Sequence, residues 1–379
     1  MSNSKFKVEF TLKQHTPIIH FQSDQVGATL RATELKPKFD RFLLENIKDL
    51  PFKKTASGEK SLSYKIKIIA YNNNIETIEK INPKNQKEIP DPLFFGNMGN
   101  NIVKKKFAQA KELKIEFFSF SSEIKKAIEE KFEAFLANTN FGTRQNKGYG
   151  SFYLDNPFDK TLIPYEVYSF NSNNWKQDIK LLYSFLRQGI NYPKGRDLPS
   201  RFYSKPAIFT FALTKNWTWD KKAIKQHFFS NELKEQQKKY DLNSPVNANG
   251  QNTFLLRDLF GLSSEQSWMS YRASIKKEHE KEQKQEEIER FKSPLTFKII
   301  NNTVYFWADK SVEKILDKTF KINAIGTPLN LKTPKVFCFN EFFEYVKSID
   351  LSKHIDSKFH KEPEFNSLKR ILDSIKASK

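Results

Sequence analysis

The first 154 residues switch repeatedly between two hydrophobic periods, and this switching constrains the fold more than any other feature. Apolar residues at every second position indicate half-buried strands over 6–12, 62–68 and 113–117, and residues 151–154 are predicted as a further short strand. Apolar residues at helical spacing indicate helices over 39–47 and 124–136. Pro37 fits the first turn of the first helix, and Ser121 or Ser122 can cap the second. The predicted order of elements is β-α-β-β-α-β.

That order is the ferredoxin-like arrangement. The stretch 71–111 is rich in Asn, Pro and Lys, and it would form an insertion between the second and third strands. Asn156-Pro157 and Pro164 mark a boundary, so we predict a first domain over residues 1–157.

Residues 158–379 show a similar order of predicted strands and helices, although the hydrophobic periods are less regular there. We predict a strand over 165–170, a helix over 179–190, a strand over 206–213, a hairpin over 295–307, a helix over 310–320 and a strand over 335–339. With 219–293 as an insertion, these elements form a second β-α-β-β-α-β unit. The expected fold class is therefore α+β, with two ferredoxin-like domains in tandem, followed by a C-terminal helix over 365–375. The charged run 274–290 is either a solvated helix or a linker; we favour a helix and assign it no chemistry.

Glycine is scarce in this chain, with 12 in 379 residues, yet three lie within nine residues at Gly142, Gly148 and Gly150. Such a cluster indicates positive φ or close backbone approach. Its N–H groups could approach phosphates, while Arg144 and Lys147 add charge and Tyr149 offers a stacking face. The spacing matches neither the phosphate loop of nucleotide triphosphatases nor the dinucleotide fingerprint. An ordinary glycine-rich turn is the structural alternative.

The formal net charge of +20 fits a polyanionic partner, and we favour nucleic acid over an acidic membrane surface. Simple solubility is the alternative. Arginines are informative because a planar guanidinium contacts phosphates and bases in a bidentate way.

The motif Gly-x-Arg-x-x-x-Gly-Tyr-Gly-Ser over 142–151 resembles the glycine-rich loop of the RAMP superfamily of CRISPR-associated RNA-binding proteins. Thr16-Pro17, Leu30-Arg31 and the segment 35–42 are similar to the pattern of the first-numbered subunit of type III-B (Cmr) effector complexes. Pro37 and Asp40 depart from that pattern, which has glycine and leucine there. The segment 290–295 resembles the Arg-x-x-Ser-Pro-Leu that opens a central strand in such proteins, whereas 321–335 holds one glycine, so a second glycine-rich loop is degenerate.

The resemblance implies a two-domain RAMP subunit that holds the 3′ part of a guide crRNA and helps to capture target RNA. It also implies other Cmr-complex RAMP subunits as partners and a role in antiviral defence. We predict no cofactor. The predicted RNA contacts in the first domain are Arg31, Lys36, Lys38, Arg41, Gly142, Arg144, Lys147, Gly148, Tyr149 and Gly150. Those in the second domain are Arg196, Arg201, Arg290 and Lys292. Tyr192 and Phe202 are further candidates for stacking.

The resemblance implies a binder, but a ribonuclease remains the alternative. His15 and His20 flank Thr16-Pro17, where a general base could act on a 2′-hydroxyl, and Asp24 lies where related subunits place a cleaving aspartate. The six histidines form no metal-binding motif, so we predict no metal site. A protein scaffold with basic faces is a second alternative.

The cellular setting is predicted from two absences. Cys338 is the single cysteine, which excludes an internal disulfide, and no run of about 18 apolar residues occurs. We therefore expect a cytoplasmic protein that does not enter the membrane.

Overall fold

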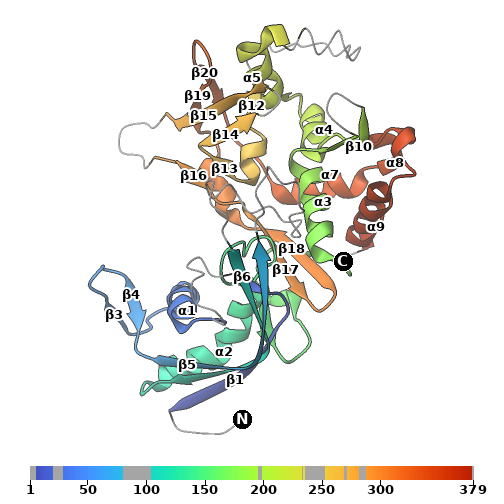
Figure 1. Ribbon diagram of the computed structural model, residues 1–379. Helices are drawn as coiled ribbons and strands as arrows, with labels where there is room; N and C mark the ends of the chain where they lie inside the picture. The colour runs from blue at the N-terminus through green and yellow to red at the C-terminus, as the bar shows by residue number, and fades with distance from the viewer. Residues whose placement is uncertain are drawn as a thin grey trace. The chain divides into compact units, whose positions relative to one another are not determined.

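The computed structural model describes residues 6–19, 29–79, 104–194, 199–232, 234, 252–268, 271–280 and 287–377. The chain forms two compact units, which are described separately. Unit 1 comprises residues 1–179 and 296–307, and unit 2 comprises 180–295 and 308–377. Both contain helices and sheets, so the expected α+β class is confirmed (Figure 1). No helix among the described residues has the length and apolar character needed to cross a membrane.

Unit 1 is built on a sheet of long antiparallel strands. The strand order is β5-β6-β1-β7, and a short strand, β2, also pairs with β6. The elements are β1 (Lys7–Gln14), β2 (Ile18–Ile19), α1 (Ala32–Asn46), β5 (Lys65–Glu79), β6 (Lys104–Phe118), α2 (Ser122–Asn138) and β7 (Phe152–Leu154). Apart from β2 and a small hairpin between α1 and β5, which were not predicted, this sequence of elements agrees with the predicted β-α-β-β-α-β order for residues 6–154.

Helices α1 and α2 cover one face of this sheet (Figure 1). The contact between helices and sheet is made by phenylalanine side chains. Phe39 of α1 lies 5.8 Å from Phe117 of β6 and 5.2 Å from Phe132 of α2, measured between ring centroids. All three rings are buried, and aromatic pairs at such distances stabilise a core beyond their buried area. Ser121 caps α2 as predicted, because its side chain accepts a hydrogen bond from the Ile124 N–H at 3.2 Å.

The predicted insertion 71–111 lies partly inside the sheet. β5 and β6 pair in register from Lys65↔Phe118 to Glu79↔Lys104, so 71–79 and 104–111 extend the hairpin. The remaining positions, 80–103, are outside the described residues. A small hairpin of β3 (Phe52–Lys54) and β4 (Lys60–Leu62) lies beside α1 (Figure 1).

A second, three-stranded sheet extends unit 1 beyond the predicted boundary at residue 157. Its strands are ordered β17-β18-β8, with β8 (Tyr168–Asn171), β17 (Leu295–Ile300) and β18 (Thr303–Ala308). The hairpin predicted over 295–307 is therefore confirmed, and Asn301 takes positive φ at its turn. Residues 296–307 pack with unit 1 although they lie far along the chain.

Unit 2 contains a six-stranded sheet and several helices. The sheet order is β11-β12-β20-β19-β15-β14. Its strands are β11 (Thr218–Trp219), β12 (Thr253–Phe254), β14 (Glu265–Trp268), β15 (Ala273–His279), β19 (Thr319–Asn323) and β20 (Leu329–Lys332). Two small sheets pair β9 (Ile190–Pro193) with β10 (Ser200–Ser204) and β13 (Leu262–Ser263) with β16 (Arg290–Phe291). The helices among its described residues are α4 (Ala207–Thr214), α5 (Asp220–Phe228), α7 (Phe339–Ser348), α8 (Leu351–His354) and α9 (Pro363–Ala377), while α3 (Trp175–Arg187) begins in unit 1.

Several predictions for the second half of the chain were wrong. The segment 206–213, predicted as a strand, lies in helix α4, since a short and mostly apolar run has no period that distinguishes a helix from a strand. Helix α7 begins at Phe339, where a strand was predicted to end, and 310–320 is a 3₁₀ helix over Lys310–Ile315 followed by β19. The segments predicted to build a second β-α-β-β-α-β unit therefore do not form one. Helix α3 and the C-terminal helix α9 are confirmed.

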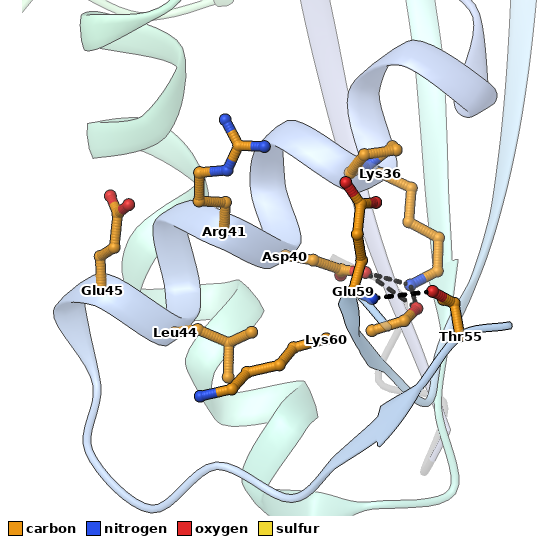
Figure 2. A pocket seen from close by; sticks show the side chains of 10 residues that line it. Lys36, Asp40, Arg41, Leu44, Glu45, Thr55, Glu59 and Lys60 are labelled. Atoms are coloured by element: carbon orange, nitrogen blue, oxygen red, sulfur yellow. Dashed lines mark hydrogen bonds and ion pairs between the residues drawn. The ribbon is translucent and has the colours of Figure 1, made fainter. Parts of the chain in front are cut away.

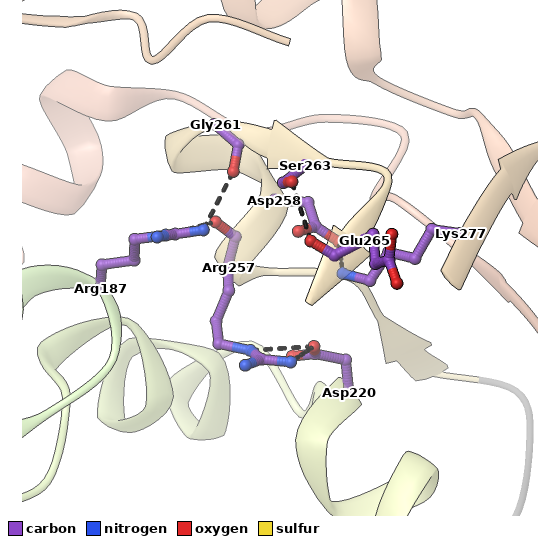
Figure 3. A network of polar contacts seen from close by, with 8 residues as sticks. All are labelled: Arg187, Asp220, Arg257, Asp258, Gly261, Ser263, Glu265 and Lys277. Carbon is purple, nitrogen blue, oxygen red and sulfur yellow. Dashed lines mark hydrogen bonds and ion pairs between the residues drawn. The ribbon is translucent and has the colours of Figure 1, made fainter. Parts of the chain in front are cut away.

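The charged run 274–290 is a strand at its start, not the helix we expected. β15 pairs with β14 and β19, and its residues alternate between exposed and buried. Within it Lys277 is fully buried and pairs with the buried Asp258. Nearby, Arg257 donates to Asp220 at 2.8 Å, and Arg187 donates to the Gly261 carbonyl at 3.0 Å (Figure 3). Pairing with neighbouring strands and the ion pair with a buried carboxylate thus favour a strand here, although the local charge pattern predicted a helix.

Candidate nucleic-acid interface

The glycine-rich segment 142–150 is a loop between α2 and β7 whose base is closed by backbone pairing. Asn140 and Ser151 form an antiparallel bridge, and the Phe141 N–H donates to the Gly150 carbonyl at 3.0 Å. Gly142, Gly148 and Gly150 all have positive φ, as the cluster predicted.

The glycines are required by packing inside unit 1. A Cβ on Gly150 would lie 1.9 Å from the Phe141 carbonyl oxygen, and one on Gly142 would lie 2.5 Å from the Ile19 carbonyl oxygen. A Cβ on Gly148 would meet the Ile299 Cδ1 atom of β17 at 2.1 Å. The close backbone approach predicted from the sequence is thus an approach to the protein itself.

The backbone N–H groups of the loop point largely into the protein, contrary to the prediction that they approach phosphates. The Gly150 N–H donates to the Pro17 carbonyl at 2.9 Å, and the Gly142 N–H donates to the Glu34 carboxylate at 2.7 Å. Thr143, Lys147 and Gly148 also donate their N–H groups to carbonyls of unit 1. An N–H that already donates to a protein acceptor is not available to an RNA phosphate.

The Thr16-Pro17 turn after β1 holds the loop from one side. The Thr16 hydroxyl donates to the Gly148 carbonyl at 2.6 Å and accepts from the Ser151 N–H at 2.9 Å. Thr16 is fully buried, so this pair of bonds is shielded from water. This contact between the turn and the loop was not predicted from the sequence.

Helix α1 holds the loop from another side through Glu34 and Lys38. The Glu34 carboxylate, which accepts from Gly142, also pairs with the Lys38 ammonium at 2.7 Å. That ammonium donates further to the Gln145 side chain at 3.0 Å and to the Asn140 carbonyl at 3.3 Å. Lys38, predicted as an RNA contact, is therefore engaged in joining α1 to the loop.

Lys36 is engaged in a similar way, beside a groove between α1 and the β3-β4 hairpin. Its ammonium lies 2.7 Å from the Asp40 carboxylate, donates to the Leu62 carbonyl at 2.8 Å and lies 4.0 Å from the Tyr64 ring centroid. Figure 2 shows Lys36 and Asp40 directed at each other, while the Arg41 guanidinium lies apart from them. The groove has a volume of about 430 Å³, and exposed Arg41 is one of its lining residues.

The remaining predicted contacts of unit 1 differ in exposure. Tyr149 is fully buried and its ring packs edge-on against Trp175 at 5.1 Å, so it does not offer the predicted stacking face. Lys147 is half-buried, with its ammonium 5.8 Å from the Phe297 ring centroid. Arg31, at the N-cap of α1, and Arg144, at the loop tip with φ of 60°, are also half-buried.

The β17-β18 hairpin contributes a residue that was not predicted from the sequence. Lys298 is fully buried, and its ammonium donates to the Thr139 carbonyl at 3.1 Å, the Phe152 carbonyl at 3.1 Å and the Asn140 side-chain oxygen at 3.3 Å. All three acceptors are uncharged, and burial lowers the Lys298 pKa to about 7. The role of Lys298 could not be predicted from its position within an apolar strand, because its acceptors lie more than 140 residues away in the sequence.

The candidate catalytic residues receive no support as a set. His15 accepts the Asn301 N–H on its Nδ1 at 3.1 Å, which leaves the proton of the neutral ring on Nε2. Burial, reinforced by Lys298 and Lys13, lowers the His15 pKa to about 4. His20 and Asp24 lie outside the described residues. Among the residues that the structure describes, no group of three potential metal ligands occurs.

The predicted contacts of unit 2 are dispersed among different elements. Arg201 of β10 pairs with Glu362 at 2.8 Å and with Glu364 of α9, and these carboxylates raise its pKa. Phe202 is fully buried and therefore cannot stack on a base as predicted. Arg290 and Lys292 are exposed around β16. Arg196 lies outside the described residues.

Comparison with protein families decides the identity of the chain. The Cmr1 N-terminal domain model matches residues 5–191, and the Cmr1 C-terminal domain model matches residues 203–376. The chain belongs to the Cmr1 family. The resemblance drawn from the glycine-rich loop and the α1 motif is thereby confirmed.

Solved structures of this kind are similar to the chain only distantly. One is the crystal structure of Cmr1 from Pyrococcus furiosus in its apo form, with 11% identity, a TM-score of 0.31, and coverage of 80% of this chain and 89% of that one. Another is a cryo-EM structure of the Type III-B Cmr-beta bound to cognate target RNA, with 12% identity, a TM-score of 0.30, and coverage of 40% of this chain and 59% of that one. No curated protein matches the sequence.

Proposed function

We propose that this Cmr1-family chain is a non-catalytic, RNA-binding subunit of a type III-B CRISPR effector complex, where it holds the guide crRNA and helps to admit target RNA. The observation that carries the proposal is the match of Cmr1 domain models to both halves of the chain. The net charge of +20 supports a nucleic-acid partner.

The RNA contacts in unit 1 come from arginine side chains around the loop and not from the loop backbone. Glu34 and Lys38 lie against the loop, and Arg31 precedes Glu34 by one helical turn. Arg31 and Arg144 are thus carried by neighbouring segments whose positions are fixed by the Glu34 and Lys38 bonds. Guanidinium groups held on such a support suit phosphate oxygens.

The proposal predicts that the double variant Arg31→Ala, Arg144→Ala weakens RNA binding and flattens its salt dependence. Each lost contact to a single-strand phosphate should reduce the slope of log K against log salt by about 0.7. The measurement is a titration of labelled single-stranded RNA with full-length protein at several salt concentrations, with circular dichroism to confirm folding.

The matched control removes two exposed lysines of unit 1, Lys111 and Lys126, and should leave the slope nearly unchanged because both lie on other parts of the unit. An unchanged slope in a folded double-arginine variant would remove the loop region from the RNA site. Failure of the wild-type protein to bind RNA would favour the scaffold alternative.

Absence of catalysis is the second part of the proposal. A general base works best with a pKa near the operating pH, and the His15 pKa of about 4 makes it a weak one. Labelled guide precursor and target RNA should remain intact with the protein, with or without divalent metal. Specific products that disappear in His15→Ala, His20→Ala or Asp24→Ala would establish the ribonuclease alternative.

A further inference from the structure

The face of the unit 1 sheet opposite α1 and α2 carries an exposed aromatic cluster near one end. Phe117 points to the helices, so its neighbour Phe118 points to the opposite face. Phe118 is 39% exposed and Phe120 is 80% exposed, which is unusual for side chains of this size. Their ring centroids lie 5.0 Å apart, and the Phe6 ring lies 5.4 Å from Phe120. We name Phe6, Phe118 and Phe120 the aromatic cluster.

Lysines flank this cluster in register across the sheet. Phe118 of β6 is opposite Lys65 of β5 on one side and opposite Lys7 of β1 on the other. Residues opposite each other in a sheet share a face, so these three side chains form one row, and Lys67 lies two residues along β5 on the same face.

The charges on this face leave two lysines available to an anion. Lys7 is 3.0 Å from Glu116, and Lys114 is 2.9 Å from Glu9, so these four groups neutralise one another. Within the described part of the chain, exposed Lys65 and Lys67 make no ion pair.

We infer that this sheet face is a second RNA site, where bases of single-stranded RNA stack on Phe118 and Phe120 while Lys65 and Lys67 contact the adjacent phosphates. The inference rests on the proposed RNA-binding function and adds a surface separate from the glycine-rich loop. Exposed aromatic rings next to unpaired cations are the combination that binds single strands without sequence preference. A four-stranded sheet with aromatic residues on its free face is an established support for base stacking.

A protein partner would also cover exposed phenylalanines, but the row of charges favours RNA. A protein interface is depleted of lysine at its core, whereas here Lys65 and Lys7 lie directly beside Phe118.

The test compares Phe118→Ala, Phe120→Ala with wild type in the full-length protein. The probe is a labelled single-stranded oligouridine, and a duplex RNA of equal length is the second probe. Loss of two stacking rings should weaken oligouridine binding about tenfold or more and leave duplex binding nearly unchanged. Lys65→Ala, Lys67→Ala should weaken binding of both probes and reduce the salt slope.

Phe52→Ala is the control, because Phe52 is 42% exposed in the β3-β4 hairpin and lies outside the aromatic cluster. It should bind both probes as wild type does. If the loop variant Arg31→Ala, Arg144→Ala weakens binding while the Phe118 and Phe120 variant does not, the sheet-face site is overturned and the proposed function stands. A phenylalanine variant that binds RNA normally but no longer joins co-expressed Cmr subunits would identify the surface as a protein interface.

Discussion

Among the residues that the structure describes, each unit buries one lysine within a strand, and the two lysines find their hydrogen-bond acceptors in opposite ways. Lys277 in unit 2 meets the carboxylate of Asp258 inside a network that also contains Arg257 and Asp220 (Figure 3). Lys298 in unit 1 meets only uncharged oxygens, from Thr139 and two further residues. Burial lowers the pKa of both, but the Asp258 charge opposes the effect at Lys277.

The difference shows how a buried cation can serve two purposes. An ion pair in a core tolerates no loss of either member, because the survivor remains charged and desolvated. A lysine that donates to neutral carbonyls can lose its proton near neutral pH, and it links the segments that provide those carbonyls. In unit 1 these segments are the C-terminal end of α2, the base of the glycine-rich loop and β7.

The largest expected change in the free energy of unfolding comes from removing the counter-charge of Lys277, so that this lysine, like Lys298, has only uncharged acceptors. Asp258→Asn removes the carboxylate and leaves a buried ammonium without a counter-charge, so we expect a loss of about 3–5 kcal/mol in the free energy of unfolding. Chemical denaturation of the full-length protein measures it. The control Lys277→Met, Asp258→Leu removes both charges and should recover most of the loss. A single Asp258→Asn variant as stable as wild type would show that the pair does not stabilise unit 2.

A smaller change in the free energy of unfolding is expected when Lys298 is replaced, and this change should depend on pH. Lys298→Met leaves three oxygens without this donor, which should cost about 1–3 kcal/mol at pH 7. The folded pKa of about 7 lies below the unfolded value, so the unfolded state binds more protons above pH 7. Wild-type stability should therefore rise, relative to the Met variant, as the pH increases from about 7 to 10.

The measurement is the difference in unfolding free energy between wild type and Lys298→Met across that pH range. The control is Lys126→Met, which removes an exposed lysine of unit 1 and should give a difference that stays flat with pH. A flat difference for Lys298→Met as well would mean that Lys298 keeps its proton throughout.

The smallest change in the free energy of unfolding is expected at Arg201, which has two carboxylate partners but is only partly buried. Its side chain is 40% exposed, so water and salt screen its pairs with Glu362 and Glu364. Arg201→Ala should cost about 0.5–1 kcal/mol, and high salt should shrink the difference. Because the guanidinium of Arg201 is already paired with those carboxylates, the RNA affinity of Arg201→Ala should stay within twofold of wild type. A marked loss of RNA binding would restore Arg201 to the predicted contacts.

Prediction from sequence succeeded where local period and local chemistry decide the structure. The four strands and two helices predicted within residues 6–154, the Ser121 cap and the positive φ of Gly142, Gly148 and Gly150 all follow from such signals. It failed for α4 and for β15, because an apolar run and a charged run each adopt the structure that their distant partners impose.

The same distinction applies to the candidate site. The sequence located the glycine-rich loop and the start of α1, which together led to the Cmr1 family. It also treated Lys36, Lys38 and Tyr149 as available to RNA, although the fold engages the first two and buries the third. Whether a polar group faces a ligand or the protein depends on acceptors that the sequence places far away.

By itself, then, the sequence determined the β-α-β-β-α-β order of unit 1, the positions that must be glycine, and the basic character of the chain. Only the tertiary structure decided that the loop N–H groups point inward, that the 296–307 hairpin packs with unit 1, and that Lys298 lies beneath the loop. The physical reason is the separation along the chain of the residues that decide each property. Backbone conformation and hydrophobic period are properties of neighbouring residues, whereas burial and hydrogen bonding are satisfied between segments that meet only when the chain has folded.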